Sequence, residues 1–270
     1  MHVDITGQTG ENAPTVLLSS GLGGAGAYWT PQTEALGEHF RILTYDHRGT
    51  GLTGGEVPET GGIGAMADDV LGIARRHGLS QFDFVGHALG GLIGLHLALH
   101  HPDLVRRLVL INAWSAVDAH TERCFDVRID LLKHAGVAAF VRAQPLFLYP
   151  AAWMADNPQR LSREEAHALA HFQGQTNLLR RIEALRAFDI DAQLHAITTP
   201  ALVIATQDDL LVPHARSLHL AQGLPNARLA LLPRGGHAVN VTQPDLFNRL
   251  LIDFLTAPDG HDIEKAATHG

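Results

Sequence analysis

Three groups of residues along the chain have side chains or backbone groups suited to acid–base or nucleophilic chemistry. The first is Gly86-His87-Ala88-Leu89-Gly90, which has the G-x-S-x-G frame of a sharp strand–turn–helix, with alanine where serine would stand. Glycine at both ends of the frame lets the chain turn tightly and lets the helix pack close to the strand. Because a methyl group cannot attack a carbonyl carbon, the covalent acyl-enzyme route is closed at Ala88.

The second group supplies an acid and a base. Asp208 and Asp209 follow a predicted strand over 201–206, and His237 follows another over 229–232. A carboxylate can fix the tautomer of an imidazole and support its positive charge, while the imidazole moves protons. We predict His237 and Asp209 as the catalytic pair, since Asp209 fits an Asp-x-x-x-Pro pattern. Asp208 stays an alternative acid, which could instead cap the next helix.

The third group is a glycine-rich loop, Ser20-Gly21-Leu22-Gly23-Gly24, after the first clear predicted strand. We expect the backbone N–H groups of Leu22 and Leu89 to bind a developing oxyanion or a carboxylate. The loop lacks the Gly-Lys-Ser/Thr ending of a phosphate-binding loop, which argues against a nucleotide site. Three serines near strand ends are alternative nucleophiles, but none stands at the tip of the turn, and we interpret them as structural: Ser19, Ser20 and Ser115.

The eighteen histidines raise the question of a metal site. His167 and His171 are four residues apart, so they could share one face of a helix and hold a metal ion. No third ligand follows at a clear spacing, and the chain contains no H-E-x-x-H sequence. We therefore expect neither a metal nor another cofactor.

Composition narrows the class of protein. A chain of 270 residues with 46% hydrophobic and 18% charged residues suits one large globular domain. It contains no apolar run of about 20 residues and no evident signal peptide. The single cysteine, Cys124, cannot form an internal disulfide, so we expect a cytoplasmic protein. With a net charge of −8 we expect a small-molecule substrate, and neither nucleic acid nor membrane as partner; a homodimer stays open.

Apolar, β-rich runs alternate with helical patterns along most of the chain. Such alternation predicts an α/β fold with a mostly parallel sheet covered by helices on both faces. Only about a dozen residues precede Val16, so we expect a single strand there rather than a hairpin. The remaining strands are expected at 16–20, 42–46, 82–85, 108–112, 201–206 and 229–232, and the helices at 29–38, 66–77, 89–101 and 243–255.

The middle of the chain has a different pattern, which is helical throughout. We predict helices at 124–132, 137–144 and 163–185, forming a cap over 117–189 inserted into a core made of 1–116 and 190–257. Residues 258–270 are polar and unpatterned, and we expect a flexible tail. Five aromatic side chains of the cap could either roof a pocket or attach the cap to the sheet: Phe125, Phe147, Tyr149, Trp153 and Phe172.

The order of turn tip, acid and histidine is that of the α/β-hydrolase triad, and the chain resembles that superfamily over nearly its whole length. Within it, the chain is similar to the RutD proteins of the bacterial Rut pathway of pyrimidine degradation. The phrases that carry this narrower resemblance include Tyr45-Asp46-His47-Arg48-Gly49, Gln144-Pro145-Leu146-Phe147-Leu148-Tyr149-Pro150, His171-Phe172-Gln173-Gly174 and Gly236-His237-Ala238-Val239-Asn240. The resemblance also implies that alanine at position 88 is native, although the residues alone leave an engineered replacement open.

The resemblance implies an activity on a small nitrogen compound late in uracil breakdown, 3-aminoacrylate or carbamate. Either substrate would make the protein a hydrolase of a C–N bond that releases ammonia. Both compounds also decompose unaided in water, so general acid–base help of about 10²–10⁴-fold would suffice without a nucleophile. Two alternatives stay open: a protein that binds a metabolite without catalysis, and a serine esterase with alanine in place of serine at position 88.

Overall fold

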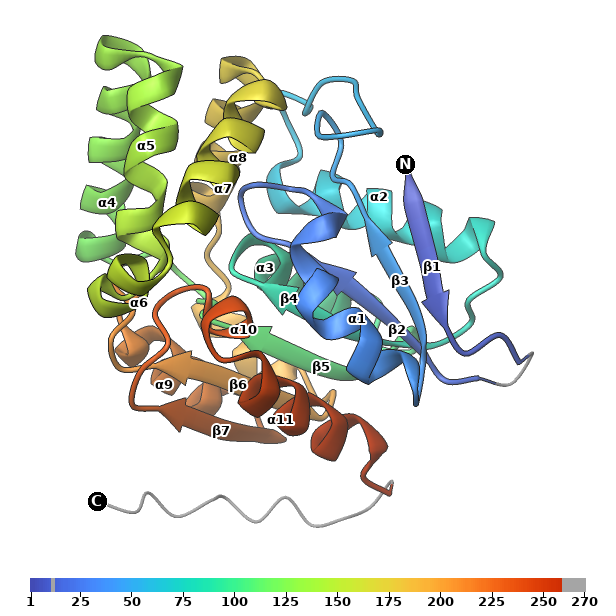
Figure 1. Ribbon diagram of the computed structural model, residues 1–270. Helices are drawn as coiled ribbons and strands as arrows, with labels where there is room; N and C mark the ends of the chain where they lie inside the picture. Colours follow the sequence, from blue (N-terminus) through green and yellow to red (C-terminus); the bar gives the residue numbers. More distant parts are fainter. Residues whose placement is uncertain (11–12, 259–270) are drawn as a thin grey trace.

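A computed structural model of the chain describes residues 1–10 and 13–258 (Figure 1). Strands and helices alternate along it, with five consecutive α-helices between β5 and β6. In chain order the elements, where η1 and η3 are 3₁₀ helices and η2 is a π-helical turn, are β1 (Val3–Gly7), β2 (Thr15–Ser19), η1 (Gly26–Trp29), α1 (Thr30–Gly37), β3 (Arg41–Tyr45), α2 (Gly62–Arg76), β4 (Phe82–His87), α3 (Leu89–His100), β5 (Val105–Ile111), α4 (Ala119–Asp130), η2 (Leu131–Ala135), α5 (Val137–Leu148), α6 (Ala151–Asp156), α7 (Pro158–Ala170), α8 (Gln175–Ala187), η3 (Asp191–Ala196), β6 (Ala201–Thr206), α9 (His214–Gly223), β7 (Ala227–Leu232), α10 (Val239–Thr242) and α11 (Pro244–Thr256).

The strands form one sheet in the order β1-β3-β2-β4-β5-β6-β7, which confirms the predicted α/β fold. All neighbouring pairs are parallel except β1 and β3, which run antiparallel with Val3 opposite Tyr45. The single strand expected before Val16 is therefore β1. Strands β4 and β6 are buried along their whole length, because helices cover both faces of a parallel sheet.

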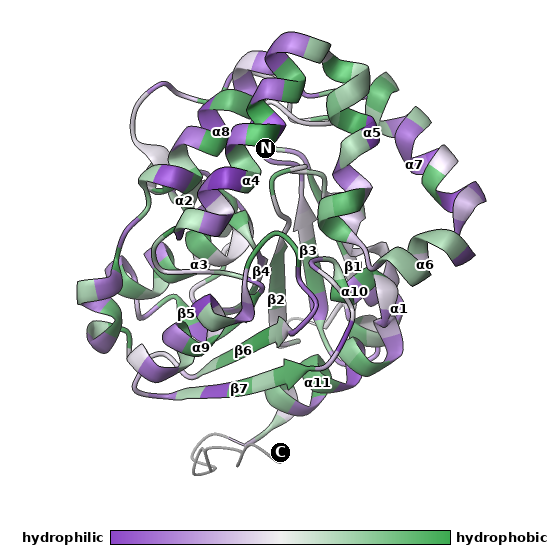
Figure 2. Cartoon of the chain, turned by 90° about the vertical axis from the view of Figure 1, so that its left-hand side faces the viewer, coloured by the Kyte–Doolittle hydropathy of each residue, from purple (hydrophilic) through white to green (hydrophobic). Residues whose placement is uncertain are grey.

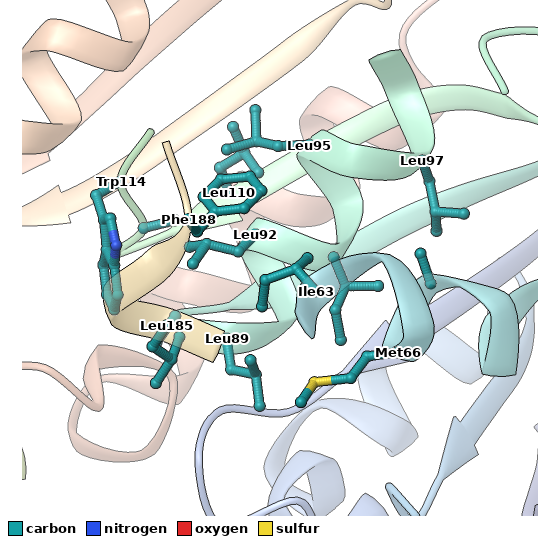
Figure 3. Packing of buried hydrophobic residues seen from close by; sticks show 14 of the residues in the cluster. Ile63, Met66, Leu89, Leu92, Leu95, Leu97, Leu110, Trp114, Leu185 and Phe188 are labelled. Carbon is teal, nitrogen blue, oxygen red and sulfur yellow. The ribbon is translucent and has the colours of Figure 1, made fainter. Parts of the chain in front are cut away.

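Helices α2 and α3 cover one face of the sheet, and α1 and α11 cover the other (Figure 1). Helix α3 is apolar around most of its circumference, because it lies between the sheet and other helices. Figure 3 shows Leu89 and Leu92 of α3 among Ile63 and Met66 of α2 and Leu185 of α8. The helix that begins at the turn tip is therefore held by packing on several sides.

Helices α4 to α8 lie together beyond the carboxyl ends of the strands (Figure 1). The chain leaves and re-enters the sheet region at one isolated antiparallel bridge between Ala116 and Asp189. The helix predicted over 163–185 is wrong: α7 and α8 are separate, with Gly174 at φ +87° between them, a backbone conformation that favours glycine. The prediction also missed α6. Helix α7 carries many hydrophilic residues (Figure 2), and none of its residues is buried.

The division into a core and a cap over 117–189 stays a prediction. Of the predicted tail over 258–270, all but Pro258 lies outside the described residues. No helix in the described part of the chain is both long enough and apolar enough to cross a membrane.

Candidate active site

Ala88 stands at the tip of the turn between β4 and α3, in a strained backbone conformation. Its φ and ψ are 46° and −107°, and its N–H donates to the carbonyl of Ile111 at 2.9 Å. A non-glycine residue at such angles costs about 1–3 kcal/mol. The flanking glycines are required by close approach: a Cβ on Gly86 would lie 2.3 Å from the Gly90 carbonyl, and one on Gly90 would lie 2.1 Å from the Ser19 carbonyl oxygen. The strained turn is kept although its tip has no hydroxyl.

His237 and Asp209 form a buried pair, as their order in the sequence predicts. Nδ1 of His237 lies 2.8 Å from Oδ2 of Asp209, and the two side chains are 2% and 0% exposed. The other carboxylate oxygen accepts the N–H groups of Leu211 at 2.8 Å and Val212 at 3.0 Å. With both oxygens engaged, the carboxylate is fixed and holds the Nδ1–H tautomer of the imidazole. Nε2 of His237 then has a lone pair with which to accept a proton.

Asp208, the alternative acid, is directed to the histidine loop instead of the histidine ring. Its carboxylate accepts the N–H groups of Gly235 at 3.2 Å and Gly236 at 2.8 Å. Thr206 also donates to the carbonyl of Gly236, at 2.8 Å. Asp208 therefore positions the loop that carries His237 and does not cap a helix.

His87, which the sequence did not single out, holds the backbone of His237 in place. Its Nε2 lies 2.8 Å from the carbonyl oxygen of His237, and the two rings meet edge to face with centroids 4.6 Å apart. Asn112, at φ 47°, donates to the same carbonyl at 2.8 Å. Burial, and then the charge of His237, lower the pKa of His87 to about 3, so its ring stays neutral and Nε2–H donates. The only signals were the place of His87 directly before the tip and an asparagine at the end of β5.

Tyr28 closes the other side of His87. The two rings lie 5.1 Å apart, and the Tyr28 hydroxyl donates to Oδ1 of Asn240 at 2.7 Å. Burial raises the pKa of Tyr28 well above its usual value, so the phenol stays protonated. The ring of His87 therefore lies in contact with the rings of both His237 and Tyr28.

The loop that contains Leu22 lies against the turn that contains Leu89. A Cβ placed on Gly21 would be 2.9 Å from Nδ1 of His87 and 3.6 Å from its carbonyl oxygen. Leu89 begins α3, so its N–H is among those that have no acceptor within the helix. The Leu22 carbonyl accepts from Gln173 at 3.2 Å and from Arg181 at 3.4 Å, which ties this loop to the helical segment above it. The loop that contains Leu22 and the turn that contains Leu89 are therefore neighbours, and the binding of an oxyanion by their two N–H groups stays a prediction.

Two of the three serines near strand ends are engaged by neighbours. The Ser19 hydroxyl lies 2.7 Å from the Tyr45 hydroxyl, and that of Ser115 donates to Asp191. Ser20 is 2% exposed and its hydroxyl has no partner among the described residues. None of the three stands at the tip of the turn.

The helices beyond β5 dock on both loops of the candidate pair. His120 of α4 lies 2.7 Å from the carbonyl oxygen of Leu210, next to Asp209. At the end of α5, the carbonyl of Leu148 accepts the N–H of Ala238 at 3.0 Å. These contacts attach α4 and α5 to the two loops that carry the acid and the histidine.

The five aromatic side chains of the predicted cap are not all used in one way. Phe125 is 1% exposed and packs near Trp114, with ring centroids 6.4 Å apart. The rings of Tyr149 and Trp153 are tilted against each other with centroids 4.4 Å apart, and the Tyr149 hydroxyl donates to Glu164. That any of the five lines a pocket stays a prediction.

His167 and His171 stack at 4.2 Å, and Nδ1 of His171 lies 3.0 Å from the His167 carbonyl. Among residues 1–10 and 13–258, no three His, Cys, Asp or Glu side chains gather where they could hold a metal ion.

Comparisons with known proteins agree with the fold. Residues 14–132 match the family model of the alpha/beta hydrolase fold. A protein of Agrobacterium fabrum, named "Putative carbamate hydrolase RutD", is 66% identical over 96% of this chain and 99% of its own length. A protein of the same name from Rhizobium rhizogenes is 61% identical over 95% and 98%. The crystal structure of the enol-lactonase from Burkholderia xenovorans superposes with a TM-score of 0.87 at 30% identity, covering 95% of this chain and 96% of that one.

Proposed function

Because the chain belongs to the α/β-hydrolase superfamily and, within it, to the RutD family, we propose that it hydrolyses the C–N bond of carbamate or 3-aminoacrylate and releases ammonia. The observation that carries this proposal is a buried His237–Asp209 pair, held at 2.8 Å, beside a turn whose tip is alanine. Such a site retains a general acid–base group and lacks the usual nucleophile. The attacking oxygen then comes from water.

The proposed mechanism uses the side chains of His237 and Asp209 and the backbone N–H groups of Leu22 and Leu89. Nε2 of His237 takes a proton from water as the water oxygen bonds to the carbon that carries nitrogen. The N–H groups of Leu22 and Leu89 bind the carboxylate or the developing negative oxygen. The imidazolium, stabilised by Asp209, returns the proton to nitrogen, and the C–N bond breaks. Carbamate would give bicarbonate and ammonia; 3-aminoacrylate would give ammonia and the enol of malonic semialdehyde, whose O–H proton then moves to C2 to give the aldehyde.

The expected rate enhancement is modest. General acid–base catalysis contributes about 10²–10⁴-fold, and oxyanion donors add to it. A substrate that decomposes unaided needs no more than this.

The test measures decay of carbamate, released from ammonium carbamate, by stopped-flow with a pH indicator. We expect the native protein to accelerate decay at least 100-fold over the buffer rate, and His237→Ala to lose most of that acceleration. His195→Ala is the matched control, because His195 is exposed and lies on η3, outside the site. The same set is measured with 3-aminoacrylate. Decay of both substrates at the buffer rate with the native protein would refute the proposal.

One observation favours a second function, that of a serine esterase with alanine at the tip. The φ of 46° at Ala88 preserves the backbone strain of a turn that presents a nucleophile. This alternative predicts no acceleration of either nitrogen compound. A third function, binding without catalysis, predicts saturable binding and no turnover.

A further inference from the structure

Arg128 is a buried cation that the mechanism above does not use. The residue lies on α4 and is 4% exposed. Its Nη2 donates to the side-chain oxygen of Gln144, which is neutral, and its Nε has no partner within the described part of the chain. No carboxylate pairs with it among residues 1–10 and 13–258. Because burying a charge without a counter-charge is costly, a cation kept in this state points to an anion that binds there.

Three aromatic rings surround this guanidinium. Its central carbon lies 5.7 Å from the ring centroid of Phe125, 5.9 Å from that of Phe140 and 5.5 Å from that of Phe147. Contacts with ring faces partly offset the loss of hydration and hold the guanidinium in one orientation. They supply no acceptor in the plane of the group, so the N–H donors stay available to a planar anion.

Its place on α4 directs Arg128 toward the candidate active site. His120, Cys124 and Arg128 are spaced four apart, so they share one face of the helix. His120 Nε2 lies 2.7 Å, and Cys124 Sγ 3.8 Å, from the carbonyl oxygen of Leu210, which is next to Asp209. The charge of Arg128 acts on the pKa of the Cys124 thiol, against the rise that burial causes, so the guanidinium lies near the residue that contacts this loop.

The same guanidinium is linked to the histidine loop through α5. Phe147, over which it lies, directly precedes Leu148, and the Leu148 carbonyl accepts the N–H of Ala238. Ala238 directly follows His237. Arg128 is therefore linked through its neighbours to both segments that carry the acid and the base.

We propose that Arg128 binds the substrate's carboxylate, and that the substrate has this carboxylate at one end and its reacting carbon at the other. That the bound anion is the substrate rests on the proposed function. That an anion binds at this place rests on Arg128 alone. A carboxylate can accept two N–H bonds from one guanidinium, which fixes its orientation as well as its charge. Of the two candidates, 3-aminoacrylate has a carboxylate separate from the carbon attacked; in carbamate they are the same group.

Binding of propionate and of its neutral isostere propionamide, followed by NMR titration, tests the anion site without any turnover. We expect native protein to bind propionate at least tenfold more tightly than propionamide, and Arg128→Met to lose this preference. Arg128→Lys retains the positive charge but lacks the planar set of N–H donors, so it should keep only part of the preference for propionate. Arg123→Met is the control: this arginine is exposed on the same helix, so the preference should be unchanged.

Equal affinity of native protein for propionate and propionamide overturns the proposal, as does an unchanged preference in a folded Arg128→Met variant. If that variant does not fold, an unchanged preference in Arg128→Lys does the same. The kinetic counterpart is a KM for 3-aminoacrylate raised at least tenfold in Arg128→Met, with little change in kcat. Propionate selectivity without turnover of either nitrogen compound would refute the proposed function and leave the anion site standing.

Discussion

Acidification should destabilise the fold through His87, and the size of the effect follows from the environment of its ring. The ring is 3% exposed, and burial lowers its pKa from 6.5 to about 3. Below pH 6.5 the unfolded chain takes up a proton at this residue, while the folded protein does not. Protons therefore favour the unfolded state, and stability falls as pH decreases from 6.5 toward 3.

The change in unfolding free energy is that caused by the uptake of one proton per unfolded molecule at His87. At pH 5, which is 1.5 pH units below the unfolded pKa, His87 alone should cost about 2 kcal/mol of unfolding free energy relative to pH 7.5. Its contribution to the slope approaches about 1.4 kcal/mol per pH unit between pH 6 and pH 4. Other groups titrate in this range too, so a difference between variants is the informative quantity.

Urea denaturation at pH 4.5 to 7.5 measures this difference. His87→Gln replaces the ring by a neutral amide that can still donate toward the carbonyl of His237, so its stability should depend less steeply on pH. The slope should fall by about 1 kcal/mol per pH unit below pH 6. His195→Gln, at an exposed position, is the control with an unchanged slope. Equal slopes in native protein and His87→Gln would refute the assignment of a neutral, buried His87.

Three further predictions concern the site. Ala88→Ser should create hydrolysis of p-nitrophenyl acetate at least 100-fold above native protein, because the backbone already has the angles of the tip; an inactive, folded variant would contradict this. Asp209→Asn should slow ammonia release by about 10²-fold or more, since the Nδ1–H tautomer of His237 loses its acceptor; a native rate measured by stopped-flow would contradict this. Arg128→Met should unfold at equal or higher temperature than native protein, with a gain of about 1–4 kcal/mol, because it removes an unpaired buried charge; a clear loss in thermal melts would mean that the guanidinium is structural.

The sheet was predictable because its strands are short apolar runs between helical patterns. Mostly apolar runs such as 82–85 and 201–206 are typical of strands that are buried on both faces. The structure places these two runs in β4 and β6. The break between α7 and α8 was missed because a single residue, Gly174, separates two helical patterns that read as continuous. The additional helix α6 is only one and a half turns long and has no buried residue.

The candidate pair could be predicted from chain order, since the carboxyl ends of parallel strands share one edge of a sheet. The supporting residues could not. His87 and Asn112 act on the backbone of His237, more than 100 residues away, and no local pattern indicates such a bond. Arg128 looks in the sequence like an ordinary helical arginine, and only its burial and the rings around it distinguish it.

The bridge between Ala116 and Asp189 has an evolutionary consequence. Both ends of the segment from α4 to α8 meet at this bridge, and the N–H of Ile190 donates to the carbonyl of Ser115 beside it at 2.9 Å. Because the segment leaves and re-enters at one place between β5 and β6, we expect changes in its length to leave the strand register of the sheet unchanged. We therefore expect relatives of this protein to differ more in the segment from α4 to α8 than in the sheet, and to differ with it in the small molecules that they accept.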